Sequence, residues 1–114
     1  MILGDKDQLL RTFNNLLKNA IEATEAKEEG LVGIKINNDS QYVFIEVGDN
    51  GKGIDKSLEH KIFAPNFTTK SSGTGLGLAF VKQAIENAGG TIDFKSSANV
   101  GTTFYISFPL LTIT

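Results

Sequence analysis

Two asparagines, Asn15 and Asn19, are four residues apart in a segment with helical periodicity. Residues at this spacing share one face of an α-helix, so the two amides would lie one above the other. A carboxamide oxygen is a neutral, hard ligand that suits Mg²⁺ when water and phosphate oxygens supply the remaining ligands. An asparagine on a helix flank is more often simply hydrated, so the pair indicates a metal site only in combination with other motifs.

One acidic residue, Asp49, ends an apolar stretch and opens the sequence Asp-Asn-Gly-Lys-Gly-Ile. At the end of a strand, its carboxylate would accept hydrogen bonds from an exocyclic amino group such as that of adenine. An acceptor left unpaired there costs about 1–3 kcal/mol, which would disfavour guanine. Asp-Asn-Gly is also a common turn sequence, and taken alone it favours a turn.

Residues 70–78 read Lys-Ser-Ser-Gly-Thr-Gly-Leu-Gly-Leu and lead from a polar segment into a helical pattern. Glycines at a helix start allow backbone N–H groups to approach a phosphate closely, and the helix end carries roughly half a positive charge. Lys70 would add an ammonium group. A Rossmann site would need a strand directly before the glycines, and a P-loop would need GxxxxGK[ST]; the sequence has neither.

The helices that would position these residues follow from the spacing of apolar side chains. Spacings of three and four predict a helix over residues 6–27, with a capping box at Asp5 and Gln8 and the end of a strand at residues 1–3. A second helix is predicted over residues 76–88, stopped by two glycines.

Alternating apolar residues predict four strands that pair as two hairpins. They are centred on residues 32–36, 43–47, 92–94 and 104–108. Residues 48–77 lack periodicity and predict a long loop with one helical turn, a length that is typical of a functional lid. Helices with one apolar stripe and strands with one apolar face predict an α+β fold, a two-layer α/β sandwich with the helices on one face of a mixed, mostly antiparallel sheet.

Composition narrows the class of protein. The 114 residues fit one domain, residues 1–114, and the lack of cysteine together with a lone histidine excludes disulfides and histidine or thiolate metal sites. A net charge of -2 gives no basic stripe, so we expect no nucleic acid and no direct membrane contact. Without an apolar membrane-crossing run or a signal peptide, we expect a cytoplasmic domain and leave open whether its parent protein is membrane-anchored.

Five sequence blocks together, in one order, resemble the Bergerat-fold ATPase and kinase superfamily over nearly the whole chain. Residues 15–20 resemble the N box, residues 49–53 the G1 box, residues 63–67 the F box, residues 73–78 the G2 box and residues 101–104 the final glycine-threonine block.

Within this superfamily, the chain resembles the ATP-binding catalytic domain of a bacterial two-component sensor histidine kinase. Gyrase, MutL and heat-shock chaperones have a glutamate four residues before the metal-binding asparagine, where it activates water. Here that position is Asn15, which cannot take a proton at neutral pH, as suits a kinase whose nucleophile is an external histidine. Two alternatives remain: a degenerate module that only binds nucleotide or a partner, and a superfamily ATPase or serine protein kinase.

The resemblance implies ATP, ADP and Mg²⁺ as ligands, with a lid over about residues 54–74. It implies that Asn19 holds Mg²⁺, that Asp49 reads adenine, and that Thr102 supports Asp49 or its water. Asn15, Asn19 and Lys70 would be the catalytic residues. The full set of implied nucleotide contacts is Asn15, Lys18, Asn19, Asp49, Gly51, Gly53, Ile54, Thr69, Lys70, Gly73, Thr74, Gly75, Leu76, Gly77 and Thr102.

The implied partners are the protein's own dimerisation and histidine-phosphotransfer domain, which this sequence lacks, and a downstream response regulator. Two positions depart from the family pattern: Glu22 stands where some members have a lysine, and Asn66 replaces an aromatic residue of the F box. We interpret His60 as a surface residue. Phe63 and Phe67 either anchor the lid or belong to the core.

Overall fold

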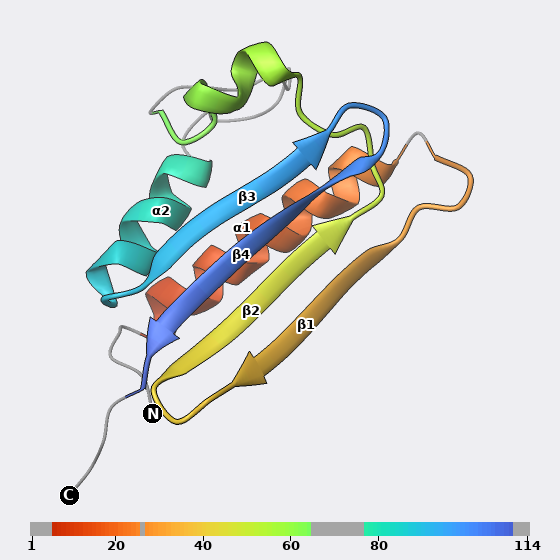
Figure 1. The fold of residues 1–114 in the computed structure, drawn as a ribbon. Coiled ribbons are helices and arrows are strands. Elements are labelled where there is room, and N and C mark those ends of the chain that lie inside the picture. Colours follow the sequence, from red (N-terminus) through yellow and green to blue (C-terminus); the bar gives the residue numbers. More distant parts are fainter. Residues whose placement is uncertain (1–5, 26, 65–76, 111–114) are drawn as a thin grey trace, which may run out of the picture.

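The computed structural model describes residues 6–25, 27–64 and 77–110 of the chain. Its elements, in order, are α1 (Lys6–Thr24), β1 (Val32–Asn38), β2 (Tyr42–Asp49), the 3₁₀ helix η1 (Lys56–Lys61), α2 (Gly77–Asn87), β3 (Thr91–Ser97) and β4 (Gly101–Pro109). Figure 1 shows α1 behind the sheet and α2 beside it. The predicted capping box, the strand end at residues 1–3 and most of the glycine-rich segment lie outside the described residues.

The four described strands form one open sheet in the order β1-β2-β4-β3. Every neighbouring pair is antiparallel, so the described part of the sheet has none of the parallel pairing that a mixed sheet would contain. A short turn joins the two strands of each hairpin, β1–β2 and β3–β4. In the first turn, Asp39 Oδ1 accepts hydrogen bonds of 2.7 Å from the backbone N–H groups of both Gln41 and Tyr42. The two predicted hairpins are therefore confirmed.

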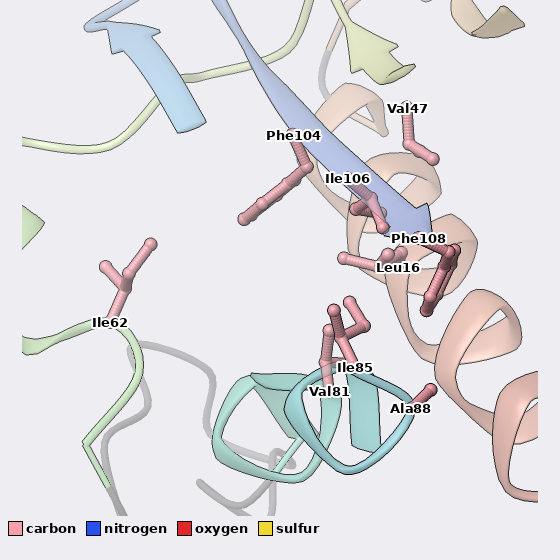
Figure 2. Packing of buried hydrophobic residues seen from close by; sticks show 9 residues of the cluster. All are labelled: Leu16, Val47, Ile62, Val81, Ile85, Ala88, Phe104, Ile106 and Phe108. Atoms are coloured by element: carbon pink, nitrogen blue, oxygen red, sulfur yellow. The ribbon is translucent and has the colours of Figure 1, made fainter. Parts of the chain in front are cut away.

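The core lies between the two helices and the sheet, which confirms the predicted two-layer α/β sandwich. Leu16 of α1 and Val81 and Ile85 of α2 are at most 1 % exposed. Figure 2 shows Phe104, Ile106 and Phe108 of β4 among these helical side chains. The buried cluster consists of Leu16, Val47, Ile62, Val81, Ile85, Ala88, Phe104, Ile106 and Phe108.

Helix α1 ends at Thr24, three residues earlier than the sequence predicted. The backbone N–H of Lys52 donates to the carbonyl of Ala23 at 3.1 Å, so a distant loop binds the carbonyl that a continuing helix would use. The Thr24 hydroxyl also contacts the carbonyls of Ala20 and Ile21 at 3.2 and 2.9 Å. The prediction failed because helical periodicity does not register a tertiary contact at a helix end.

Candidate functional site

A row of polar side chains crosses one end of the sheet. Asp49, the last residue of β2, is the register partner of Thr102 on β4, and Thr102 is the partner of Ser96 on β3. Side chains at paired positions lie on the same face of a sheet, and here that face is the one covered by the helices. Thr102 is 6 % exposed, and its Oγ1 lies 2.8 Å from the Ser96 Oγ.

The loop after Asp49 is packed directly against the end of α1. A Cβ added at Gly51 would collide with the carbonyl group of Ala23 and would lie 2.8 Å from the Ala23 Cβ. The adjacent backbone N–H of Lys52 donates to that same carbonyl. Only a glycine lets the loop approach the helix this closely. The Gly51 N–H in turn donates to Asp49 Oδ1 at 2.8 Å, which orients the carboxylate.

Asn50 holds the same loop on its other side. Its Nδ2 donates to the carbonyl of Glu29 at 2.8 Å, and its Oδ1 accepts from the N–H of Leu31 at 2.7 Å. The backbone N–H of Asn50 also donates to the Leu31 carbonyl at 3.2 Å. These three bonds join the loop to the segment that enters β1, so Asn50 has a structural role beside the acidic residue.

The second glycine of the loop, Gly53, contacts the turn between β3 and β4. Its φ of +71° lies in the left-handed region, and a Cβ there would collide with the Ser97 carbonyl. The Lys52 carbonyl accepts from the N–H of Asn99 at 2.7 Å, and the Lys27 Nζ donates to the Asn99 carbonyl at 3.2 Å. The loop at residues 49–54 therefore connects α1, β1 and the β3–β4 turn.

The two asparagines lie on the flank of α1 nearest this loop. Asn19 is one helical turn and Asn15 two turns before Ala23, which corresponds to about 6 and 12 Å along the helix axis. Both are half-buried, and Asn19 interacts with other groups of the structure. Arg11, one turn before Asn15, places its guanidinium carbon 4.3 Å from the ring centre of Phe80 in α2. Helix α1 therefore contacts the first turn of α2 through Arg11.

Ile54 and η1 begin the segment predicted to form the lid. The Ile54 N–H donates to the Ser96 Oγ at 2.7 Å. Asp55 caps η1: the backbone N–H and the hydroxyl of Ser57 donate to Asp55 Oδ1 at 2.9 and 2.8 Å. These two hydrogen bonds, the backbone one first, hold the pKa of the Asp55 carboxyl below its ordinary value. The predicted helical turn in this loop is confirmed as η1.

Phe63 packs its ring against the sheet just after η1. Its ring centre lies 5.9 Å from that of Phe94 and 6.4 Å from that of Phe104, both in edge-on geometry. The adjacent Ile62 is 2 % exposed. Such edge-on pairs add about 0.5–1.5 kcal/mol to the apolar burial. Phe63 is thus a partly buried residue that packs against the core just after η1.

The remaining predicted site residues divide into two groups. Lys18 is exposed and Glu22 is half-buried. His60 is also exposed, which agrees with its interpretation as a surface residue. Gly77 is the first residue of α2. The others lie outside the described residues: Thr69, Lys70, Gly73, Thr74, Gly75 and Leu76, together with Asn66 and Phe67.

The chemical types of the predicted side chains suit a magnesium-bound adenosine phosphate: Asp49 and Thr102 are paired on neighbouring strands, and Asn15 and Asn19 are one turn apart on α1. Asp49 and Thr102 offer hydrogen-bond acceptors at the sheet end. The amide oxygens of Asn15 and Asn19 are ligands of the type that Mg²⁺ accepts beside water and phosphate.

A family model for the histidine kinase-, DNA gyrase B- and HSP90-like ATPases matches residues 4–112. The chain belongs to this family. Sporulation kinase A of Bacillus subtilis (strain 168) is 44 % identical over 108 residues, which cover 95 % of this chain and 18 % of that protein. The sensor histidine kinase ZraS of Escherichia coli (strain K12) is 40 % identical over 109 residues, covering 96 % and 23 %.

Solved structures agree with this membership. The mycobacterial sensor histidine kinase MprB matches with a TM-score of 0.83 and 29 % identity over 95 % of this chain and 76 % of that one. The catalytic domain of the histidine kinase ThkA, in a nucleotide-free form, matches with a TM-score of 0.79 and 37 % identity over 93 % and 68 %. This ATPase-family chain is thus a catalytic domain of the sensor histidine kinase type. It spans about a fifth of the length of sporulation kinase A and of ZraS.

Sequence reasoning missed two residues that hold the site together, Asn50 and Ser96. Asn50 was part of a recognised motif, but its partners Glu29 and Leu31 are about twenty residues away in the chain. Ser96 was one of several polar residues in a predicted turn. The only sequence indication was its place opposite Thr102 in a hairpin, and this becomes informative only once the register is known.

Proposed function

We propose that this chain binds ATP with Mg²⁺ between α1, the Asp49 end of the sheet and the start of α2, and transfers the γ-phosphoryl group to a histidine on a separate domain. In this reaction an imidazole nitrogen forms a bond to the γ-phosphorus while the bond from that phosphorus to the bridging oxygen breaks, so that ADP leaves. Mg²⁺ would neutralise phosphate charge during transfer.

The residue that carries this proposal is Asn15. It is a half-buried residue of α1, one helical turn before Asn19. An amide cannot accept a proton at neutral pH, so this position cannot activate water for hydrolysis. It can still position a phosphate group or a ligand of the metal. The chain therefore suits transfer to a nucleophile supplied from outside, which is the behaviour expected of a histidine kinase catalytic domain.

Other residues of the chain would bind and orient the substrate. Asp49 would accept from the adenine amino group, with the Gly51 N–H fixing the carboxylate. Asn19 would hold Mg²⁺, and Lys70 with Thr69 and the glycines of residues 73–77 would close over the phosphates. The segment of residues 54–74 would act as the lid. Lys18, Gly53 and Ile54 would complete the nucleotide contacts.

The acceptor histidine would reside on the dimerisation and histidine-phosphotransfer domain of the same protein, which would pass the phosphoryl group to a response regulator. The domain would work in the cytoplasm. In the part of the chain that the structure describes, no helix has the length and apolar character needed to cross a membrane.

The direct test compares binding with turnover for the 114-residue chain. We expect titration calorimetry to detect Mg·ATP binding, and a phosphate-release assay to detect negligible hydrolysis. Vigorous hydrolysis would contradict the kinase assignment and favour an ATPase. If the chain did not bind Mg·ATP, neither the kinase assignment nor the ATPase alternative would hold.

A substitution tests the adenine contact. Asp49→Asn replaces a charged acceptor by a neutral amide, and we expect ATP affinity to fall about ten- to a hundredfold while the fold is retained. Asp93→Asn is the matched control, because Asp93 is an exposed strand carboxylate whose neighbours Ile92 and Phe94 face the core. Equal affinity of the Asp49 variant and the control would remove the adenine role of Asp49.

A further inference from the structure

Ser96 joins three parts of the candidate site through one hydroxyl group. Its Oγ accepts from the Ile54 N–H at 2.7 Å, donates to the Gly101 carbonyl at 3.2 Å, and lies 2.8 Å from the Thr102 Oγ1. Ile54 is the first residue of the lid segment, and Thr102 is the register partner of Asp49. The residue and its three contacts are partly buried.

Counting protons identifies the one direction of the bond between the two hydroxyl groups that satisfies every contact of Ser96. A serine hydroxyl has one proton to donate and two lone pairs that can accept. The proton of Ser96 is directed to the Gly101 carbonyl, and one lone pair accepts from the Ile54 N–H. Either hydroxyl could donate across the 2.8 Å contact, but all three contacts of Ser96 are hydrogen bonds at the same time only if Thr102 is the donor there. Its single proton then points towards β3 and away from Asp49.

This assignment leaves Thr102 with lone pairs only on the side of Asp49. An ionised carboxylate is likewise an acceptor only. Two acceptors side by side suit the amino group of adenine, or a water molecule bound to it, and they repel the keto oxygen at the corresponding position of guanine. A threonine whose proton was not held would rotate and donate to that oxygen.

We propose that Ser96 is a specificity-determining positioning residue. By taking the Thr102 proton it makes the sheet end an acceptor-only edge, and so it sets the preference for adenine over guanine nucleotides. This inference rests on the proposed nucleotide-binding function. Ser96 acts through Thr102 and does not itself contact the base. Its bond to the Ile54 N–H also ties the first residue of the lid segment to the same hydroxyl pair.

The test measures the ratio of the GTP and ATP dissociation constants, each with Mg²⁺, by titration calorimetry. Removing one neutral hydrogen bond typically changes an equilibrium by about three- to tenfold. We therefore expect Ser96→Ala to lower the ratio by about that factor, and Ser96→Thr, which keeps a hydroxyl, to restore it. Ser97→Ala is the control, because Ser97 is the exposed neighbour on the same strand. A general loss of stability would weaken the binding of ATP and GTP alike and leave the ratio of their dissociation constants unchanged.

Thr102→Val provides an independent measurement, because Ser96→Ala also removes the acceptor of the Ile54 N–H and its folding must be checked by circular dichroism. If Ser96 acts through Thr102, Thr102→Val lowers the ratio as well, and adding Ser96→Ala to it causes no further drop. An unchanged ratio in Ser96→Ala, or independent and additive effects of the two changes, would overturn the inference while wild-type ATP binding still supported the proposed function. A wild-type chain that binds neither nucleotide would instead refute the proposed function, and this inference with it.

Discussion

Replacing Gly51 by alanine tests whether the loop after Asp49 must contact α1 as closely as the structure has it. The added Cβ would meet the Ala23 carbonyl and lie 2.8 Å from the Ala23 Cβ. Carbon atoms in ordinary contact are about 3.5–4.0 Å apart, so the loop or the helix end must move by roughly 1 Å. That movement would also stretch the 3.1 Å bond from the Lys52 N–H to the same carbonyl.

The size of the effect follows from two opposing terms. Overpacking a close contact costs about 1–3 kcal/mol. Alanine also reduces the freedom of the unfolded chain, which returns about 0.4–1 kcal/mol. We expect Gly51→Ala to lower the free energy of unfolding by roughly 1–2 kcal/mol, and the melting temperature of a domain of this size by about 4–12 °C. Because the loop carries Asp49, ATP affinity should fall as well.

Urea denaturation followed by circular dichroism measures the first effect, and titration calorimetry with Mg·ATP measures the second. Gly33→Ala is the matched control. It makes the same chemical change on the edge strand β1, where a Cβ would meet nothing within 4 Å. We expect the control to stay within about 0.5 kcal/mol of the wild type. Equal stability of the two variants would show that Gly51 does not need its close contact with Ala23.

Two further predictions concern residues that shape the same loop and the lid segment. Asn50→Ala removes the side-chain hydrogen bonds of 2.7 and 2.8 Å to residues 31 and 29. The free energy of unfolding measured by urea denaturation should therefore fall by about 1–3 kcal/mol. A loss below about 0.5 kcal/mol would show that Asn50 does not hold the loop to the segment before β1. For Asp55, hydrogen bonds from Ser57 lower the folded-state pKa, so its contribution to η1 is present above the ordinary aspartate pKa and is lost as the pH falls through the lowered folded value. In an NMR pH titration the Ser57 amide should shift with a midpoint below the ordinary aspartate value, and Asp55→Asn should abolish that transition; a midpoint at or above the ordinary value would refute the cap.

The helices and strands were predictable because their apolar residues follow the periods of regular structure. Val43, Ile45 and Val47 alternate along β2, and Leu78, Val81 and Ile85 recur along α2. All of these except the half-buried Val43 belong to the core or pack against it. The end of α1 was not predictable. It depends on a bond from Lys52 to Ala23, between residues that only the completed fold brings together.

The candidate site was predictable only in part, for the same reason. Asp49 and Thr102 belong to recognisable motifs, and the structure places them opposite each other on neighbouring strands. The hydroxyl of Ser96 lacks a motif in the sequence, and its role follows from strand register together with the approach of Ile54. Motifs thus indicated which residues could bind nucleotide, whereas the residues that orient them became identifiable only from their contacts.

An NMR-monitored titration of the chain with Mg·ATP tests the central claim most directly. If ATP binds between α1 and the Asp49 end of the sheet, the amide signals of Asn19, Gly51 and Thr102 should shift in a saturable way. Those of Asn37, at the end of β1 remote from Asp49, and of Asp93 on the opposite edge strand should not move. A spectrum unchanged at saturating Mg·ATP, or shifts confined to residues away from the Asp49 end, would contradict the account.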